Sequence, residues 1–285
     1  MEMSTFQHLV WEASCRGELS FLGNNPTGRR WLGAPSAGTV LALSPHQDDP
    51  DSIAVTLRIF ARAGCRIRYA ILCSSHGGVT DHFALAHAKA AGTGKIKDLL
   101  VYKRKIRNGE QTASARLAGF VAGDCRFIEG AVEDGRGNLA EAPANRTLLK
   151  KVVEEEDADI VVLPYGEDTN AGHVNVYRYL CEVAPKVALA RKRPLLALFN
   201  HDPKTIQITH HLVVPFDGEA ARWKASLLRT HTSQHERNLE ERGFGFDERI
   251  LRTNREIQTR LQERVLEPWK DECLYAEAFQ VELFS

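Results

Sequence analysis

Residues 40–43 of the chain, Val-Leu-Ala-Leu, form a short apolar run that leads into a histidine and two adjacent aspartates. An unbroken apolar run of this length is typical of a parallel strand that is buried on both faces of its sheet. In open α/β sheets, ligands bind in the crevice beyond the carboxyl ends of such strands. We therefore expect His46, Asp48 and Asp49 to lie at the functional end of a mostly parallel sheet.

The spacing of His46 and Asp49 allows one tight turn to direct an imidazole nitrogen and a carboxylate oxygen to a common point, while Asp48 points elsewhere. Two neighbouring carboxylates in a cleft repel each other, and a divalent cation bound to one of them keeps both ionised. Such a cation needs a third protein ligand. The alternative is a turn in which an aspartate side chain caps the backbone and no metal is bound.

His173 is the best candidate for the third ligand, because it follows a second apolar strand and a polar loop and opens a predicted helix. Two histidines and one aspartate with a vacant fourth position are typical of catalytic zinc, whereas structural zinc sites usually have four protein ligands. The six cysteines include no Cys-x-x-Cys pair. Non-haem iron uses the same ligand types, so zinc is the preferred ion and another divalent transition metal is the alternative.

This pattern resembles the PIG-L/LmbE-like de-N-acetylases, zinc enzymes that remove acetyl groups from amino sugars, over roughly residues 38–283. The signature of that family is a strand followed by Ala/Ser-His-Pro-Asp-Asp-Glu, which is similar to residues 44–50. The resemblance implies that His46 and Asp49 bind the metal and that Asp48 is the general base. It also implies a Rossmann-like α/β fold with the metal site at the carboxyl ends of the strands.

A second motif of the family, His-Pro-Asp-His, resembles Asn170 to His173 and implies that His173 is the third metal ligand. The resemblance also implies that Arg107 grips sugar hydroxyls or an anionic substituent. Several motifs that match the family in the same order are stronger evidence for the resemblance than one motif alone. The further matches are an Arg-x-x-Glu helix at Arg107 to Glu110 with Gly119, a Lys-x-x-Ala/Ser-Leu…His-x-Ser-Gln helix at Lys224 to Gln234, and a closing Ala-Glu-x-Phe strand at Ala276 to Phe279.

Two departures from the family pattern affect the expected chemistry. Pro50 replaces the acidic residue after the aspartate pair, and Asn170 replaces the first histidine of the second motif. That histidine is thought to stabilise the oxyanion or protonate the leaving amine in some members, and asparagine can donate a hydrogen bond but cannot deliver a proton. Asp48, once protonated, and His231 are the candidate general acids. Asn170 remains a candidate substrate contact.

The composition limits the class of protein. With 285 residues, 43% of them hydrophobic, the chain can bury one substantial core. We expect a single domain at 39–285 and an N-terminal extension at 1–38 that packs on it. Lysine plus arginine equals aspartate plus glutamate at 37 each, so nucleic acid is not an expected partner. The cysteines are scattered and predict reduced thiols.

The start of the chain contains no secretory signal pattern, and no apolar run reaches the length of a membrane span. We therefore expect a cytoplasmic protein without a membrane partner. No Gly-x-Gly-x-x-Gly follows the first strand, which disfavours a nicotinamide dehydrogenase. A homo-oligomeric state is compatible with the sequence but is not specified by it.

Strands and helices alternate along the chain in a βαβ rhythm, which predicts an α/β fold. The loop after the strand at 66–73 should lie beside the metal, which makes His76 a candidate substrate contact. The predicted strands are 66–73, 126–128, 160–163, 195–199, 211–214 and 275–283. The predicted helices are 53–64, 104–118 and 145–156, the last with Asn145 as its N-cap. Two charged helices are also expected within 218–270, and His231 and His235 should share one face of the first of them.

The segment between Gly78 and Arg107 is rich in basic residues. The simpler interpretation is a solvated loop with a short helix. The sharper hypothesis is a basic lid that selects a substrate with phosphate or carboxylate groups.

Together these features predict a zinc-dependent hydrolase that removes the acetyl group from an N-acetylglucosamine-type amino sugar. The alternatives are a zinc amidohydrolase acting on a non-sugar or thiol-conjugated amide, and a catalytically degenerate member that binds a sugar or metal.

Overall fold

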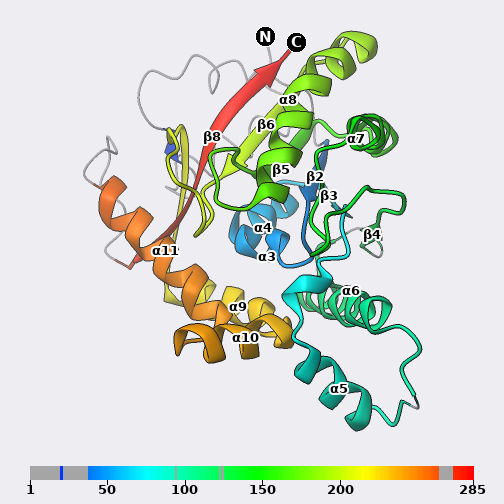
Figure 1. Ribbon diagram of the computed structural model, residues 1–285. Helices are drawn as coiled ribbons and strands as arrows, with labels where there is room; N and C mark the ends of the chain where they lie inside the picture. Colours follow the sequence, from blue (N-terminus) through cyan, green and yellow to red (C-terminus); the bar gives the residue numbers. More distant parts are fainter. Residues whose placement is uncertain (1–19, 22–37, 94, 122, 124, 263–271) are drawn as a thin grey trace.

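The structure of the protein is a computed structural model, and it describes residues 20–21, 38–93, 95–121, 123, 125–262 and 272–285 (Figure 1). One eight-stranded sheet organises these residues, with the strand order β1-β7-β8-β6-β5-β2-β3-β4. The strands are β1 (Ser20–Phe21), β2 (Thr39–Ser44), β3 (Arg66–Ile71), β4 (Arg126–Phe127), β5 (Ile160–Pro164), β6 (Leu195–Asn200), β7 (Leu212–Phe216) and β8 (Tyr275–Phe284).

The centre of the sheet is parallel, as predicted. β2 pairs in parallel with β3 and with β5, and the parallel arrangement continues from β3 to β4 and from β5 to β6. β8 inserts antiparallel between β6 and β7, and the short β1 pairs antiparallel with β7. The expected α/β fold with a mostly parallel sheet is therefore confirmed.

The strand order reverses between β2 and β5. From β2 the chain builds outward through β3 and β4, and it then returns to build β5 and β6 on the other side. The loops after β2 and β5 therefore leave neighbouring strands at the same edge of the sheet. Such a switch point is where doubly wound sheets form their ligand crevice.

Helices cover both faces of the sheet. Val40 and Ala42 of β2 pack with α4 (Ala54–Arg62) and α9 (Gly218–Arg229), while Leu41 and Leu43 pack on the opposite face. That second face is covered by α7 (Pro143–Glu155) and α8 (Ala171–Arg191) (Figure 1). Because successive side chains of a strand point to opposite faces, a strand covered on both sides must be apolar throughout. This requirement explains the unbroken apolar runs.

Two predicted helix starts differ from the structure. The helix expected at 104–118 is α6 (Leu99–Ala118), because the carboxylate of Asp98 accepts hydrogen bonds from the first-turn N–H groups of Leu100 and Val101. Asn145 does not cap α7, which begins at Pro143. The Asn145 side chain is buried and binds backbone groups of residues 132 and 140 instead.

The region 218–270 contains three helices within its described part, where the sequence predicted two. These are α9, α10 (Thr232–Arg242) and α11 (Phe246–Leu261). Gly243 ends α10 in the left-handed conformation with φ 76°, which an L side chain adopts only at a cost. His231 lies at the junction of α9 and α10 rather than on one helix face with His235, so that prediction was wrong.

The basic segment after Gly78 forms α5 (Asp81–Ala90) and the beginning of α6, and α5 projects away from the sheet (Figure 1). Lys103 of this segment pairs with Asp81 at 2.5 Å. The N-terminal extension expected at 1–38 lies outside the described residues, except for β1 at the edge of the sheet and Gly38. None of the described helices combines the length and hydrophobicity needed to cross a membrane.

The candidate active site

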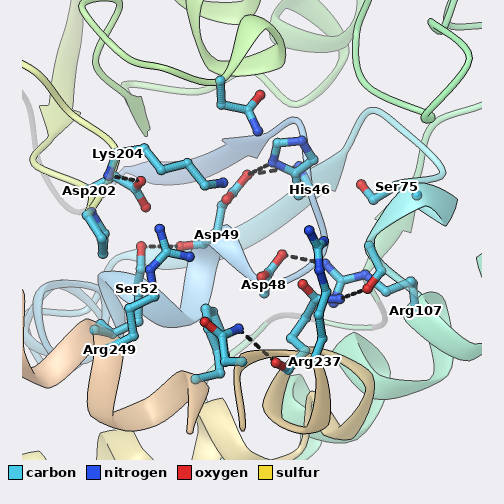
Figure 2. Close-up of a pocket in the computed structure, with 18 of the residues that line it drawn as sticks. His46, Asp48, Asp49, Ser52, Ser75, Arg107, Asp202, Lys204, Arg237 and Arg249 are labelled. Atoms are coloured by element: carbon cyan, nitrogen blue, oxygen red, sulfur yellow. Dashed lines mark hydrogen bonds and ion pairs between the residues drawn. The ribbon is translucent and has the colours of Figure 1, made fainter. Parts of the chain in front are cut away.

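A cavity of about 220 Å³ lies at the switch point, beyond the carboxyl ends of β2 and β5 (Figure 2). His46, Asp48 and Asp49 line it from the β2 side, as the sequence predicted. The short helix α3 (Asp49–Ser52) begins directly within this motif. On the far side the cavity is bordered by α10, α11 and the loop after β6.

The three predicted metal ligands converge. Nδ1 of His46 lies 3.2 Å from Nε2 of His173, and the Asp49 carboxylate oxygens lie 3.3 Å and 3.5 Å from these two nitrogens. A tetrahedral zinc ion with ligand bonds of about 2.0–2.1 Å separates its ligand atoms by about 3.3–3.4 Å. The ligand atoms of the three residues therefore lie close enough together for one transition-metal ion to bind between them.

Each imidazole is oriented by a second hydrogen bond. Nδ1 of His173 lies 2.9 Å from the Asp168 carboxylate, and the side chains of both residues are fully buried. Nε2 of His46 lies 3.1 Å from the side-chain oxygen of Asn138. A ring nitrogen that donates to an oxygen leaves the other nitrogen unprotonated for the metal, so both contacts select the tautomer that a ligand needs.

These partners were not identified from the sequence. Asp168 precedes His173 in the same loop, and the general rule that ligating histidines have carboxylate partners could have identified it. Asn138 belongs to a separate turn near the bridge between Glu133 and Leu139, and nothing in its local sequence distinguishes it. Only the fold brings that turn against His46.

Charges around the ligand triangle stabilise its ionised carboxylates. Burial raises the pKa of Asp49, but the two imidazoles lower it well below its usual range. Burial also lowers the pKa of His173, while Asp49 and Asp168 raise it to about 10. Asp49 therefore stays ionised and offers an anionic ligand beside the two imidazoles.

Asp48 points away from the triangle and forms a buried ion pair with Arg107 (Figure 2). Burial raises the pKa of Asp48, but Arg107 lowers it to about 2, against the opposing influence of Asp49. Asp48 is therefore ionised and borders the cavity beside the ligand triangle. Arg107 also lies 3.7 Å from Glu110, so the guanidinium has charged neighbours on two sides.

The candidate general acid His231 does not line the cavity. Its side chain is fully buried, and Nε2 lies 2.6 Å from the carboxylate of Asp51, which is also buried. This pair ties the start of α10 to α3. His231 therefore lies beneath the loop that carries His46 and Asp49, whereas Asp48 borders the cavity.

Two of the three predicted substrate contacts reach the cavity, and the third does not. Arg107 and Asn170 line the cavity, and the side-chain oxygen of Asn170 also caps α8 by accepting from the N–H groups of Gly172 and His173. His76 lies outside the lining. Its two ring nitrogens contact Ser74 Oγ at 2.9 Å and the Gly135 carbonyl at 3.3 Å, so the imidazole serves the loop itself.

Ser75, the neighbour of His76, is the residue of that loop that reaches the cavity. Its backbone is left-handed with φ 50°, and its side chain is 5% exposed. Its hydroxyl has no hydrogen-bond partner among the described residues. A non-glycine residue in this conformation costs about 1–2 kcal/mol, and such strain gathers at functional sites. The sequence carried no signal for this conformation.

A buried ionic network supports the metal motif from below. Nζ of Lys224 lies 2.7 Å from the Glu277 carboxylate and 2.5 Å from the carbonyl oxygen of Ser52. Glu277 also accepts hydrogen bonds from the backbone N–H groups of Val55 and Thr56 at 3.1 Å and 2.8 Å. The lysine and glutamate that matched the family pattern are therefore scaffold groups that hold α3 and α4.

No protein-family model and no curated protein sequence matches this chain. Solved structures do match its fold. N,N'-diacetylchitobiose deacetylase from Pyrococcus horikoshii matches with a TM-score of 0.60 and 16% identity, over 86% of this chain and 83% of that one. The zinc-inhibited form of teicoplanin deacetylase Orf2 matches with a TM-score of 0.52 and 16% identity, over 86% and 98%.

A structure with a different activity matches equally well. GalB, the 4-carboxy-2-hydroxymuconate hydratase from Pseudomonas putida KT2440, has a TM-score of 0.59 and 15% identity, over 86% of this chain and 95% of that one. At such identities the likeness demonstrates the fold alone. The chain thus has the fold of the LmbE/PIG-L deacetylases, and its chemistry must be argued from its own site.

Proposed function

We propose that this protein is a metal-dependent hydrolase that removes the acetyl group from an N-acetylglucosamine-type amino sugar. The observation that carries the proposal is the triangle of His46, Asp49 and His173, with an ionised acid, Asp48, at its border. Zinc is the preferred ion because two imidazoles and one carboxylate with an open side are typical of its catalytic sites. The deacetylases that share the fold support the choice of reaction.

His46, Asp49 and His173 would hold the ion. When bound there, it would supply Lewis acidity toward an acyl oxygen and lower the pKa of a water molecule. Asp168 and Asn138 hold the imidazoles in the ligating tautomer, and the buried network below holds α3 and α4 in place.

Asp48 would manage the proton. In the overall reaction, water adds to the acetamide carbonyl carbon, the carbon–nitrogen bond breaks, and acetate and the free amine are released. Asp48 accepts a proton from the attacking water and returns it to the leaving nitrogen. A carboxyl group with a pKa of about 2 is a weak base but a strong acid once protonated. The proposal therefore assigns both proton transfers to Asp48.

Hydration of an unsaturated carboxylate is the second candidate function. It is favoured by the match to the hydratase GalB and by the excess of cationic side chains in the cavity. Both reactions begin with an activated water molecule and differ in the electrophile that it attacks. Substrate assays can therefore separate them directly.

The test is a substrate panel with purified, zinc-loaded protein. Free amine and acetate are measured with N-acetylglucosamine, N,N'-diacetylchitobiose, and the 1-phosphate and 6-phosphate of N-acetylglucosamine. Loss of ultraviolet absorbance is followed in parallel with 4-carboxy-2-hydroxymuconate. We expect equal amounts of amine and acetate from at least one acetamide, loss of turnover after chelation, and recovery on adding zinc.

Asp48→Asn provides the mechanistic control. It should lower kcat by about 10²-fold or more because the proton acceptor is lost, while metal content stays unchanged because the three ligands are kept. Lys151→Gln is the matched control. Lys151 is exposed on α7 and does not line the cavity, so this variant should behave like the wild-type protein. Metal-loaded protein that releases amine from no acetamide on the panel would contradict the proposal, and hydration of the muconate would select the second candidate.

A further inference from the structure

The cavity beside the ligand triangle is cationic, although the chain as a whole has no net charge. Six basic and four acidic side chains line it, which leaves an excess of two positive charges before any metal binds. The basic residues are Arg107, Arg136, Lys204, Arg237, Arg242 and Arg249; the acidic residues are Asp48, Asp49, Asp202 and Glu241.

The six cations differ in how they are neutralised. Arg107 is paired with Asp48. Arg237 and Arg242 share one carboxylate, that of Glu241, at 2.8 Å and 3.9 Å. Lys204 and Arg249 have no ion-pair partner within 4.0 Å in the part of the chain that the structure describes. Arg136 has none there either, but its side chain is exposed to solvent.

Lys204 and Arg249 are half-buried and come from separate elements. Lys204 lies on the loop after β6 and Arg249 on α11, and both stand on the Asp202 side of Asp49, opposite Asp48 and Arg107 (Figure 2). The Asp202 carboxylate accepts the backbone N–H of Lys204 but lies more than 4.0 Å from the ammonium of that residue. Burial lowers the pKa of Arg249, and the neighbouring Arg242 and Arg237 lower it further, although Asp202 opposes them.

Such an arrangement is unfavourable in the free protein. A cation that is partly removed from water and faces other cations loses solvation energy without a compensating ion pair. An oxyanion placed between an ammonium and a guanidinium would form charge-assisted hydrogen bonds with both. The unpaired charges therefore fit a ligand that brings its own negative charge.

We propose that Lys204 and Arg249 form an anion subsite for the substrate, with Arg237 and Arg242 adding positive potential around it. The inference rests on the proposed function and names the substrate class: an N-acetylated amino sugar that carries a phosphate or carboxylate group. Because one cavity of about 220 Å³ is lined both by His46 and Asp49 of the triangle and by Lys204 and Arg249, the anion lies on the acetylated sugar or next to it.

This subsite replaces the basic lid that the sequence suggested. None of the described residues between Gly78 and Arg107 lines the cavity, and one cation of this segment, Lys103, pairs with Asp81 inside it. The cations that face the site come from the loop after β6 and from the last helices. A cluster of basic residues along the sequence was thus a poor guide to the cationic surface.

The first experiment measures binding rather than turnover. Inorganic phosphate is titrated calorimetrically into the zinc-loaded wild-type protein, Lys204→Gln, Arg249→Gln and the double variant. Loss of one hydrogen bond to a charged group corresponds to a change of about 10-fold or more in Kd. We expect each single variant to weaken phosphate binding by at least about 10-fold and the double variant to abolish measurable binding.

Three further variants show whether the loss of binding is specific to Lys204 and Arg249. Arg252→Gln removes a guanidinium from an exposed position of the same helix, paired with Glu248, and should leave phosphate binding unchanged. His173→Ala should keep phosphate binding, because the subsite does not include the metal. Arg249→Lys should recover part of the affinity, and circular dichroism of each variant checks its fold.

The second experiment determines whether the subsite binds a phosphate or a carboxylate group of the substrate. KM is compared for N-acetylglucosamine, its 1-phosphate and 6-phosphate, and N-acetylmuramic acid, which carries a carboxylate. Arg249→Gln should raise KM by at least about 10-fold for the preferred anionic substrate and leave that of the neutral sugar unchanged. The substrates whose KM rises more in this variant, the phosphates or the carboxylate, identify the group that the subsite binds.

The two proposals can fail separately. Phosphate binding that is insensitive to both variants, or equal changes in KM for neutral and anionic sugars, would overturn the anion subsite while the hydrolase stands. Phosphate binding that depends on Lys204 and Arg249 in a protein that deacetylates nothing would retain the subsite and reject the hydrolase.

Discussion

The cavity has two walls whose charged side chains have different partners. The strand wall consists of the loops after β2 and β5, with His46, Asp48 and Asp49 at the cavity and the fully buried His173 behind them. There each ionisable group is matched: Asp48 with Arg107, His173 with Asp168, and Asp49 with both imidazoles. The helix wall consists of Lys204, Arg237, Arg242 and Arg249, and two of these cations have no ion-pair partner among the described residues.

This difference separates the two tasks of the site. Groups that are matched within the protein keep one geometry and one protonation state, which is what a metal ion and a proton acceptor require. Cations that are unmatched can be neutralised only by something that enters the cavity. Under the two proposals, the strand wall carries out the chemistry and the helix wall selects the substrate.

The largest effect should follow from removing a ligand of the strand wall. In His173→Ala the triangle loses one corner, so metal content after gel filtration should fall from about one ion per chain to near zero, with complete loss of turnover. Elemental analysis measures the first and the amine assay the second. His235→Ala, a half-buried histidine of α10 outside the triangle, is the matched control. Full metal content in His173→Ala would show that the ion binds elsewhere.

The support beneath the strand wall should determine stability. Lys224→Met leaves the Glu277 carboxylate buried without its cation, which should lower the free energy of unfolding by about 3–5 kcal/mol in urea denaturation. The double variant Lys224→Met/Glu277→Leu removes the unpaired charge and should recover part of that loss. A single variant as stable as the wild-type protein would show that the network does not hold α3 and α4.

A smaller effect is expected from the partners of the ligands. Asp168→Asn keeps the shape of the side chain but removes the negative charge behind His173. Metal affinity should fall by about 10–100-fold in competition with a chelator. Glu167→Gln, an exposed neighbour in the same loop, should leave affinity unchanged. Equal affinities in both variants would mean that the Asp168 contact does not tune the site.

The smallest effect should come from the link between the walls. Glu110 of α6 accepts hydrogen bonds from the N–H and hydroxyl of Ser233 at 2.6 Å and 2.7 Å, which joins Arg107 to the start of α10. Glu110→Gln should destabilise the protein by about 1–2 kcal/mol. It should also raise KM for anionic sugars by a few-fold and leave metal content unchanged. A change in metal content instead would show that the walls are not independent.

Much of the fold could be predicted because buried parallel strands leave a simple pattern. The apolar runs that became β2, β5 and β6 were located to within a residue or two, and the loops after the first two were correctly assigned to the site. Helix ends were less predictable because they depend on single capping contacts. Asp98 extended α6, whereas Asn145, which looks like a cap, is used to bind a neighbouring loop.

The positions of residues with close sequence neighbours in the site could be predicted, and the positions of residues brought in from a distance could not. His46 and Asp49 are joined by one turn, and His173 follows a recognisable strand and loop. Asn138 and Ser75 depend on how separate loops pack, and their local sequences resemble ordinary turns. His231 was placed on a helix face because nothing local shows that a helix breaks there or that Asp51 lies 2.6 Å away.

The amino-acid sequence by itself determined the parallel core, the edge of the sheet where the cavity lies, and the three residues of the ligand triangle. These follow from short-range pattern, because a strand buried on both faces must be apolar and its end must carry the polar groups. Only the tertiary structure decided which acid faces which base and which cations face the cavity. Burial and pairing are set by elements distant in sequence, so Lys204 and Arg249 become neighbours of Asp49 only once the sheet and its last helices have packed together.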